Sequence, residues 1–288
     1  MKNPLVVGVN DTEASRAAAA WAMHRAAALK LPVLLVHALD DRWSYENYAF
    51  VEAIRKFGEE LLEKARARAL EVEPGVDVAT KLASGSVGNV LRKQSRKASM
   101  VVVGTGASGF GGAVTDRALQ IAAVAHCPVA VIGRNIDDDG RRGVLVGADG
   151  SEESVQAVAF AAAEADREGQ ELTILHAFGS PRFRVPHGLP GSALAEQAAE
   201  EERVVLSETA AGLAEQYPDL TVHQVLAVDT EPAKALVEAA GNARLLVLGS
   251  RGKGAFKRLL MGSTAHAVLS HLPCPAIVTR LVPAKDGE

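Results

Sequence analysis

Short apolar runs alternate along the chain with longer segments that have the period of a helix. The apolar runs, rich in Val, Leu and Ile, lie near residues 5–9, 33–38, 77–82, 100–104 and 129–132, and again near 143–148, 171–177, 221–226, 244–249 and 276–280. The helical segments of the first half lie near 14–29, 47–71, 87–97 and 113–125. Apolar strands that lack in/out alternation and are separated by helices predict parallel sheets covered on both faces. The pattern therefore predicts a doubly wound α/β fold.

The second half of the chain repeats the first. The stretch VGVNDTEAS from Val7 aligns without a gap with VGADGSEES from Val146, and SMVVVG ending at Gly104 matches RLLVLG ending at Gly249. A shared Cys-Pro then precedes the last apolar run of each half. A repeat of this length indicates two copies of one domain. We place the first domain at residues 1–134, a polar linker at 135–142 and the second domain at 143–288.

The third helix of the second copy is bounded by clear sequence signals. Thr230 is a candidate N-cap, and Pro232 suits the first turn of a helix. Gly241 suits the residue at which a helix stops. These signals predict a helix between Thr230 and Gly241.

Composition and charge narrow the class of protein. Of the 288 residues, 23% are charged and 4% are aromatic, which is typical of a globular protein with a sizeable core. The net charge of −4 gives no support for a broad nucleic-acid or membrane surface. No apolar run approaches the roughly 20 residues of a membrane helix, and the first residues do not resemble a leader peptide. We expect a cytoplasmic protein whose two cysteines, Cys127 and Cys274, are buried and structural.

A glycine-rich segment in the second copy, LGSRGKGAFKRLLMGST from Leu248 to Thr264, is the strongest functional signal. Gly249 and Gly252 follow an apolar strand and allow the backbone to approach a ligand closely. Gly262 then precedes a helix, whose first N–H groups and positive dipole end favour a phosphate. The Gly-x2-Gly-x9-Gly-Ser spacing at a strand-to-helix junction therefore predicts a polyphosphate site.

Basic residues accompany these glycines. Arg251, Lys253, Lys257 and Arg258 place positive charge along the segment, as a polyphosphate site requires. The alternative interpretation is a turn shaped by glycine with a solvated basic face.

Asp149, in the stretch GADGS, ends the first apolar run of the second copy. An aspartate at the carboxyl end of a strand can accept hydrogen bonds from ribose hydroxyls or an adenine amino group. The alternative is a helix N-cap, because Asp-Gly-Ser precedes a helix. Opposite a phosphate-binding loop, the nucleotide interpretation is favoured.

These motifs resemble the universal stress protein family in its tandem two-domain form, over nearly the whole chain. The resemblance rests on GADGS combined with the Gly-x2-Gly-x9-Gly-Ser spacing and the terminal Cys-Pro strand. It implies a five-stranded parallel sheet of order 3-2-1-4-5 in each domain, and ATP as the ligand, with or without Mg²⁺ held mainly by phosphate oxygens and water. It also implies that the two halves pair through their last strands and that whole chains form a homodimer.

The resemblance assigns twelve residues to the nucleotide site. Asp149 would hold the ribose and adenine side, Ala177 would present its backbone to adenine, and the glycine-rich segment would cradle the phosphates. The full set is Gly147, Ala148, Asp149, Ala177, Leu248, Gly249, Arg251, Gly252, Gly262, Ser263, Thr264 and Ala265.

The first copy departs from this pattern. Asn10 replaces the aspartate, and the glycine loop GTGASGFGGAVTD is two residues shorter. Aligned on Cys-Pro, Ala107 corresponds to Gly252, Thr115 to Gly262 and Asp116 to Ser263, although a gap elsewhere could bring Gly112 to a critical position. A carboxylate where a phosphate should lie opposes an anion. We therefore hypothesise that the first domain binds ATP weakly or not at all.

The sequence thus predicts an ATP-binding stress-response regulatory or sensor protein with little or slow hydrolysis. No G-x4-G-K-[ST] motif occurs, no general base clearly faces the phosphates, and we assign no catalytic and no metal-ligating residues. His37 and His176, at equivalent strand positions, are interpreted as packing residues. Two alternatives stay open: an enzyme of phosphoryl or nucleotidyl transfer, and an interaction scaffold without nucleotide.

Overall fold

The computed structural model describes residues 2–39, 48–106, 113–134, 140–179, 191–253 and 261–280. The chain divides into two compact units, with the division between residues 137 and 138. This division falls inside the predicted linker 135–142. Residues 135–139 lie outside the described residues, so the limits of the linker stay a prediction.

The first unit alternates strands and helices. In chain order they are β1 (Leu5–Gly8), α1 (Glu13–Leu29), β2 (Val33–Leu39), α2 (Tyr48–Val72), β3 (Val78–Ser84), α3 (Val87–Ser95), β4 (Met100–Gly104), α4 (Ala113–Val124) and β5 (Val129–Ile132). The strands form a parallel sheet in the order β3-β2-β1-β4-β5. The register places Gly8 of β1 between Val36 of β2 and Val103 of β4.

The second unit repeats this architecture with one added short helix. Its elements are β6 (Val144–Ala148), α5 (Glu152–Glu168), β7 (Leu172–Phe178), α6 (Gly191–Thr209), α7 (Leu213–Gln216), β8 (Val222–Val228), α8 (Pro232–Ala240), β9 (Leu245–Gly249), α9 (Ser263–Ser270) and β10 (Ala276–Thr279). The parallel order is β8-β7-β6-β9-β10. Each unit therefore has the predicted order 3-2-1-4-5, and the predicted fold class is confirmed.

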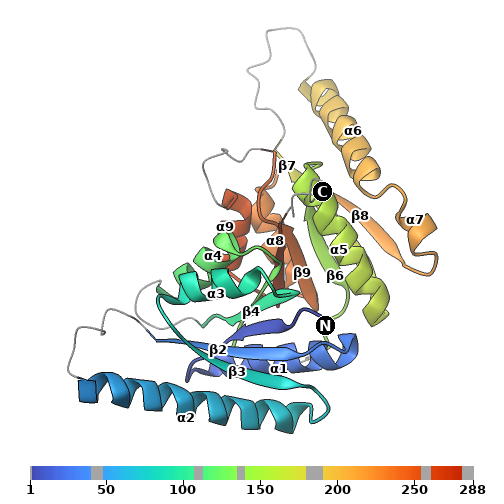
Figure 1. Cartoon of the computed structure of the whole chain (residues 1–288). Coiled ribbons are helices and arrows are strands. Elements are labelled where there is room, and N and C mark those ends of the chain that lie inside the picture. Colours follow the sequence, from blue (N-terminus) through green and yellow to red (C-terminus); the bar gives the residue numbers. More distant parts are fainter. Residues whose placement is uncertain are drawn as a thin grey trace, which may run out of the picture. The chain divides into compact units, whose positions relative to one another are not determined.

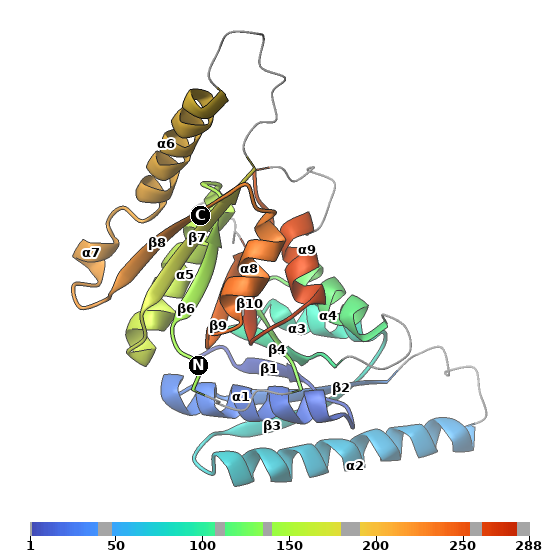
Figure 2. The same ribbon diagram turned by 180° about the vertical axis from the view of Figure 1, so that it is seen from behind.

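Helices cover both faces of each sheet, taken unit by unit (Figures 1 and 2). In the first unit α1 and α2 pack on one face and α3 and α4 on the other; in the second unit α5 and α6 lie opposite α8 and α9. The central strands are consequently buried on both sides: Val7, Val101, Val146 and Val247 expose none of their surface. This double burial explains the apolar runs without alternation.

The first helix of each unit begins in the same way. Thr12 caps α1 by accepting a hydrogen bond from the Ser15 N–H, and Ser151 caps α5 by accepting one from the Ser154 N–H. A hydroxyl at the N-cap satisfies one of the N–H groups that a helix start leaves unpaired. Both helices are therefore closed at their N-termini by their own side chains.

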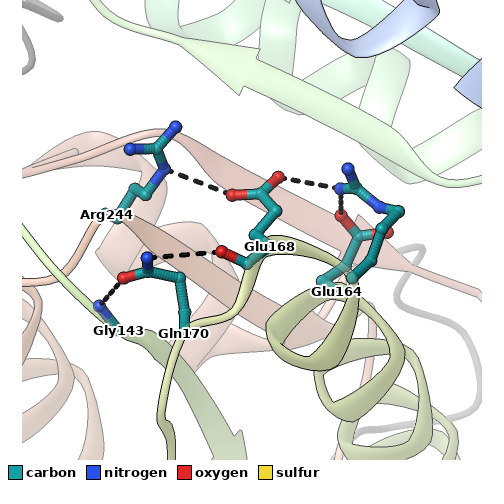
Figure 3. A network of polar contacts seen from close by, with 6 residues as sticks. Gly143, Glu164, Glu168, Gln170 and Arg244 are labelled. Carbon is teal, nitrogen blue, oxygen red and sulfur yellow. Dashed lines mark hydrogen bonds and ion pairs between the residues drawn. The ribbon is translucent and has the colours of Figure 1, made fainter. Parts of the chain in front are cut away.

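The C-terminal end of α5 is tied to the starts of two strands (Figure 3). Glu168 accepts a hydrogen bond from Arg244 Nε, just before β9, at 3.2 Å. Gln170 accepts one from the Gly143 N–H, just before β6, at 2.8 Å. These contacts hold the amino ends of β6 and β9 beside the end of α5. A functional site at the carboxyl ends of the two strands is therefore built on strands that are anchored at their other ends.

The start of α8 differs from the prediction. Its N-cap is Glu231, which makes no side-chain capping bond, and the Thr230 hydroxyl instead donates to the Val228 carbonyl at 3.2 Å. The prediction that Thr230 is the N-cap is therefore wrong by one residue. The Thr230 hydroxyl donates its hydrogen bond to the end of β8 and does not cap α8. Pro232 opens the helix and Gly241 follows its last residue, as predicted. Within the described residues no helix is long and apolar enough to cross a membrane.

Candidate functional site

A cavity of about 500 Å³ opens in the second unit, where β6, β7 and β9 end and α8 and α9 begin. Its walls come from six elements, the three strands, the two helices and the start of α5. All twelve sequence-predicted residues line it, namely Gly147, Ala148, Asp149, Ala177, Leu248, Gly249, Arg251, Gly252, Gly262, Ser263, Thr264 and Ala265. The fold therefore brings the predicted residues together at one place.

The start of α9 faces this cavity without a side-chain cap. Its N-cap is Gly262, which has no side chain, and the Gly262 N–H donates to the Ser250 carbonyl. The N–H groups of Ser263, Thr264 and Ala265 have no acceptor among the described residues. They contribute a concentrated partial positive charge at the cavity wall, which attracts an anion. This end differs from α1 and α5, whose N-caps are hydroxyl side chains.

The glycines let backbone segments approach one another closely. A Cβ on Gly252 would collide with Oδ2 of Asp149, and one on Gly249 would come within 3.2 Å of the Glu153 backbone. Around Gly262 the nearest heavy atom to such a Cβ, the Arg251 Cα, is at 3.5 Å, an ordinary contact. Gly252 is thus required by the position of Asp149, a Cβ at Gly249 would crowd the backbone, and Gly262 leaves space at the start of α9.

Asp149 has both carboxylate oxygens engaged. Oδ1 accepts hydrogen bonds from the Ser151 N–H at 3.0 Å and the Ser151 hydroxyl at 2.6 Å, while Oδ2 accepts one from the Lys253 N–H at 2.8 Å. Burial raises the pKa of Asp149, but hydrogen bonds from Ser151, Lys253 and Ser154 outweigh it and hold the pKa below its ordinary value. Asp149 therefore stays ionised and joins the end of β6 to the glycine loop. The N-cap of α5 is Ser151, so Asp149 is not itself the cap.

A guanidinium group adds positive charge beside the glycines. Arg251 lines the cavity, and its Nη2 lies 3.4 Å from Oε1 of Glu153. Its Nε is buried and has no hydrogen-bond partner among the residues that the structure describes. Burial and the positive charge of Arg251 lower the pKa of Arg280, which follows β10. Two guanidinium groups thus influence each other near the end of β9, and an anion bound there would reduce their repulsion.

An apolar part of the cavity was missed by the sequence reasoning. Leu175 of β7 and Pro232 and Leu236 of α8 line it, together with Ser154 of α5. Leu175 lies two residues before Ala177, so the period of a strand places both on the same face. Pro232 and Leu236 are one helical turn apart on α8. Once Ala177 was assigned to the site, the period of the strand could have identified Leu175. The period of the helix could likewise have linked Pro232 with Leu236.

The two strand histidines pack against the preceding strand, as the sequence interpretation expects. His176 is 5% exposed, and its Nδ1 lies 2.7 Å from the Ala148 carbonyl. The Nε2 of His176 lies 2.7 Å from Oε2 of Glu202, in α6. In the first unit His37 Nδ1 contacts the Val9 carbonyl at 2.8 Å. Because a carbonyl only accepts, Nδ1 carries the hydrogen in both, and each histidine joins neighbouring strand ends.

The first unit keeps the hydrogen-bonded turn that Asp149 forms in the second unit, but Asn10 replaces the carboxylate. Asn10 Oδ1 accepts hydrogen bonds from the Thr12 N–H at 3.2 Å and the Thr12 hydroxyl at 2.6 Å, as Asp149 does with Ser151. The position of Arg251 is taken by Gly106, and the guanidinium of Arg134 approaches it from the end of β5. Asparagine therefore supplies the same turn without a negative charge.

The helix that follows the first glycine loop also differs. α4 begins at Ala113 and already includes Thr115, which corresponds to Gly262, whereas Gly262 lies just before α9. The remaining predictions for this loop fall on Ala107, Gly112 and the side chain of Asp116, which lie outside the described residues. The same holds for the basic residues at 257 and 258 of the second loop.

Residues 1–133 and 140–280 each match the universal stress protein family. Universal stress protein Rv2005c of Mycobacterium tuberculosis is 34% identical to the chain, over 96% of both proteins. A universal stress protein of Mycolicibacterium smegmatis is 32% identical, again over 96% of each. Among solved structures, a universal stress protein from Archaeoglobus fulgidus has a TM-score of 0.70 at 17% identity, over 96% of each chain. At this identity the structural likeness concerns the fold alone.

Proposed function

This chain belongs to the universal stress protein family, and on that premise we propose that it is a stress-response regulatory or sensor protein whose second unit binds ATP. The observation that carries the proposal is the meeting, in one cavity, of the uncapped start of α9, the glycine turn after β9 and the carboxylate that ends β6. A helix start and a glycine turn suit phosphates, and a carboxylate at a strand end suits a ribose.

The parts of the cavity match the parts of ATP. The free N–H groups of Ser263, Thr264 and Ala265, with the Arg251 guanidinium, would hold the phosphates. The apolar part, which includes Leu175 and Leu236, would enclose the adenine, as hydrophobic walls commonly do in ligand sites. A volume of about 500 Å³ lies within the usual range for such pockets.

Asp149 would exchange partners when the nucleotide binds. Its oxygens now accept hydrogen bonds from Ser151 and Lys253. Ribose hydroxyls would either replace the Lys253 N–H or use the remaining lone pairs of the carboxylate. ATP binding is thereby linked to the position of the glycine loop, and ATP would favour the state of the protein that binds it more tightly.

Hydrolysis is expected to be absent or slow. Asp149 is the sole carboxylate among the lining residues that the structure describes, and both of its oxygens already accept hydrogen bonds from Ser151 and Lys253. No group of three potential metal-ligating side chains occurs among the described residues. Mg²⁺ would therefore be carried mainly by the phosphate oxygens and water.

Calorimetric titration with MgATP tests the proposal. We expect one molecule of ATP per chain for the wild type, and at least a tenfold loss of affinity for Gly252→Ala, because the added Cβ displaces Asp149. Gly88→Ala in α3 is the matched control, since a Cβ there meets nothing within 4 Å. Equal binding by both variants, or two comparable sites per chain, would contradict the assignment to the second unit.

Mass analysis of the purified protein with a product assay separates the other functions. Intact ATP supports the sensor, AMP or a modified partner supports a transfer enzyme, and absence of any nucleotide affinity supports a scaffold. The pairing of whole chains that the resemblance implies stays a prediction, which sedimentation analysis with and without ATP would test.

A further inference from the structure

The first unit contains a second kind of cavity, between α1 and α2. It has a volume of about 100 Å³ and lies on the sheet face opposite α3 and α4, whereas the cavity of the second unit lies beside α8 and α9, the counterparts of α3 and α4. Four alanines contribute to its walls: Ala19 and Ala20 of α1, and Ala65 and Ala69 of α2. Small side chains on both helices therefore leave space between them.

The corresponding position in the second unit has a larger side chain. Ala19 aligns with Val158 of α5, which is 1% exposed and so fills its surroundings. An apolar cavity that is left open lacks favourable packing contacts, and such cavities readily take up apolar ligands. At this position of the helix interface the first copy thus has the smaller side chain.

The residues that line the cavity carry more positive than negative charges. Lys64 and Arg68 line it one helical turn apart on α2, and neither has an ion pair or hydrogen bond with another described residue. Like charges at this spacing destabilise a helix. Arg16, on the opposite helix, is already 3.3 Å from Asp11. Arg16, Lys64 and Arg68 stand against Asp11 and Glu60, so the lining carries one positive charge in excess.

The lining also offers apolar surface that extends beyond the alanines. It runs along α2 from Phe57 to Val72, about 22 Å at the rise of an α-helix. Phe57 exposes 59% of its surface although it is a large aromatic residue, and Leu61 lies one turn further on. A single exposed aromatic is ordinary, but here Phe57 continues the apolar lining of the cavity, and contiguous apolar surface of this kind marks ligand sites.

We propose that this α1/α2 cavity is a binding site for a small amphiphilic carboxylate, with an unbranched apolar tail and a single anionic head. The tail lies between the alanines of the two helices and extends toward Phe57. The head pairs with Lys64 and Arg68, relieving their repulsion. The site gives the first unit a ligand of its own, independent of ATP binding in the second unit.

Titration with decanoate, at concentrations where it stays monomeric, tests the site. We expect one decanoate molecule to bind per chain. Decanol has the same tail without the charge, and its affinity should be at least tenfold weaker. Acetate has the anionic head alone and should not bind. Decanoate and decanol binding with equal affinity, or many molecules binding per chain without saturation, would overturn the proposal.

Variants locate the site. Lys64→Gln with Arg68→Gln should weaken decanoate at least tenfold and leave decanol unchanged, whereas Lys56→Gln, on the same helix but outside the lining, should change neither. Ala65→Leu fills the cavity and should abolish the binding of both. If Ala65→Leu does not fold, the charge variants still decide the question. Unchanged decanoate affinity in the Lys64/Arg68 variant excludes the site.

A third comparison keeps this proposal separate from the nucleotide site. Gly252→Ala, which we expect to lower ATP affinity, should leave decanoate affinity unchanged, and saturating MgATP should not displace decanoate. Displacement by ATP would mean that decanoate occupies the nucleotide cavity, and the proposal would then be wrong whether or not the chain binds ATP.

Discussion

The backbone N–H of Lys253 donates a hydrogen bond to Oδ2 of Asp149 at 2.8 Å, joining residues that are 104 positions apart in the sequence. The same carboxylate holds the turn that leads into α5 through Ser151. One side chain therefore shapes the end of β6 and fastens the glycine loop after β9. This double role makes Asp149 important for both stability and ligand affinity.

Replacing Asp149 by alanine should affect both properties. Asp149→Ala removes the acceptor for Ser151 and Lys253. We expect the free energy of unfolding to fall by about 1–2 kcal/mol, as for the loss of partly buried hydrogen bonds to a charged group, and ATP affinity to fall at least tenfold. Urea denaturation and calorimetric titration measure the two effects.

The repeat supplies the control for this prediction. Asn10→Ala removes the equivalent turn in the first unit, where Asn10 accepts hydrogen bonds from Thr12. It should lower stability in a similar way and leave ATP affinity unchanged. A loss of ATP affinity in Asn10→Ala as large as in Asp149→Ala would show that the effect is not local to the second unit.

The ionisation of Asp149 predicts a pH dependence of stability. Hydrogen bonds from Ser151, Lys253 and Ser154, opposed by burial, hold its pKa in the folded protein below the ordinary value of 3.8. Its contribution is therefore fully present above that ordinary value, and it is lost as the pH falls from there through the lower pKa of the folded state. The unfolding free energy of the wild type minus that of Asp149→Asn, measured from pH 6 to pH 3, should be constant at first and then decrease. An increase toward low pH would contradict the lowered pKa.

The two cysteines should be unreactive in the folded protein. Burial raises the pKa of both Cys127 and Cys274 to about 12, despite a smaller opposing effect of backbone hydrogen bonds and, for Cys274, of the Arg141 charge. At pH 8 the thiolate fraction is then on the order of one in ten thousand. Alkylation followed by mass spectrometry should label neither thiol in native buffer and both in denaturant. Rapid labelling of one cysteine in native buffer would show that its region opens.

The ends of α1 and α5 allow a paired test of backbone strain. Lys30 and Gly169 are equivalent residues, and both adopt left-handed conformations, with φ of 52° and 59°. That conformation favours glycine over residues with a Cβ. Lys30→Gly should therefore raise the unfolding free energy by about 0.5–1 kcal/mol.

Gly169→Lys should lower the unfolding free energy by a comparable amount. A Cβ at Gly169 meets nothing within 4 Å, so the effect isolates the backbone conformation from packing. Chemical denaturation measures both variants. Stabilisation by both changes, or by neither, would contradict a strain origin.

Much of the fold follows from the sequence because the repeat supplies each pattern twice. The parallel sheets and the approximate positions of the central strands follow from apolar runs buried on both faces, as Val7 and Val146 illustrate, whereas the strand order was implied by the family resemblance. The glycine spacing identified the cavity residues after β9, since a Cβ at Gly252 would collide with the Asp149 carboxylate and one at Gly249 would press on backbone atoms.

Tertiary contacts explain what sequence reasoning missed. Pro232 and Leu236 line the cavity because α8 packs against β6 and β7, a contact between elements that are distant in the sequence. The bond from Lys253 to Asp149 likewise depends on the adjacency of β6 and β9. Thr230 failed as an N-cap because its hydroxyl donates backward to Val228, a choice that the backbone geometry decides.

The turn after β1 and the turn after β6 have the same hydrogen bonds, although one is made by Asn10 and the other by Asp149. Chain reversal at this position therefore needs only an amide oxygen, so a duplicated domain can exchange the acid for its amide and still fold. Such an exchange would let one half of a fused pair lose its affinity for a ligand while continuing to serve its neighbour as a scaffold.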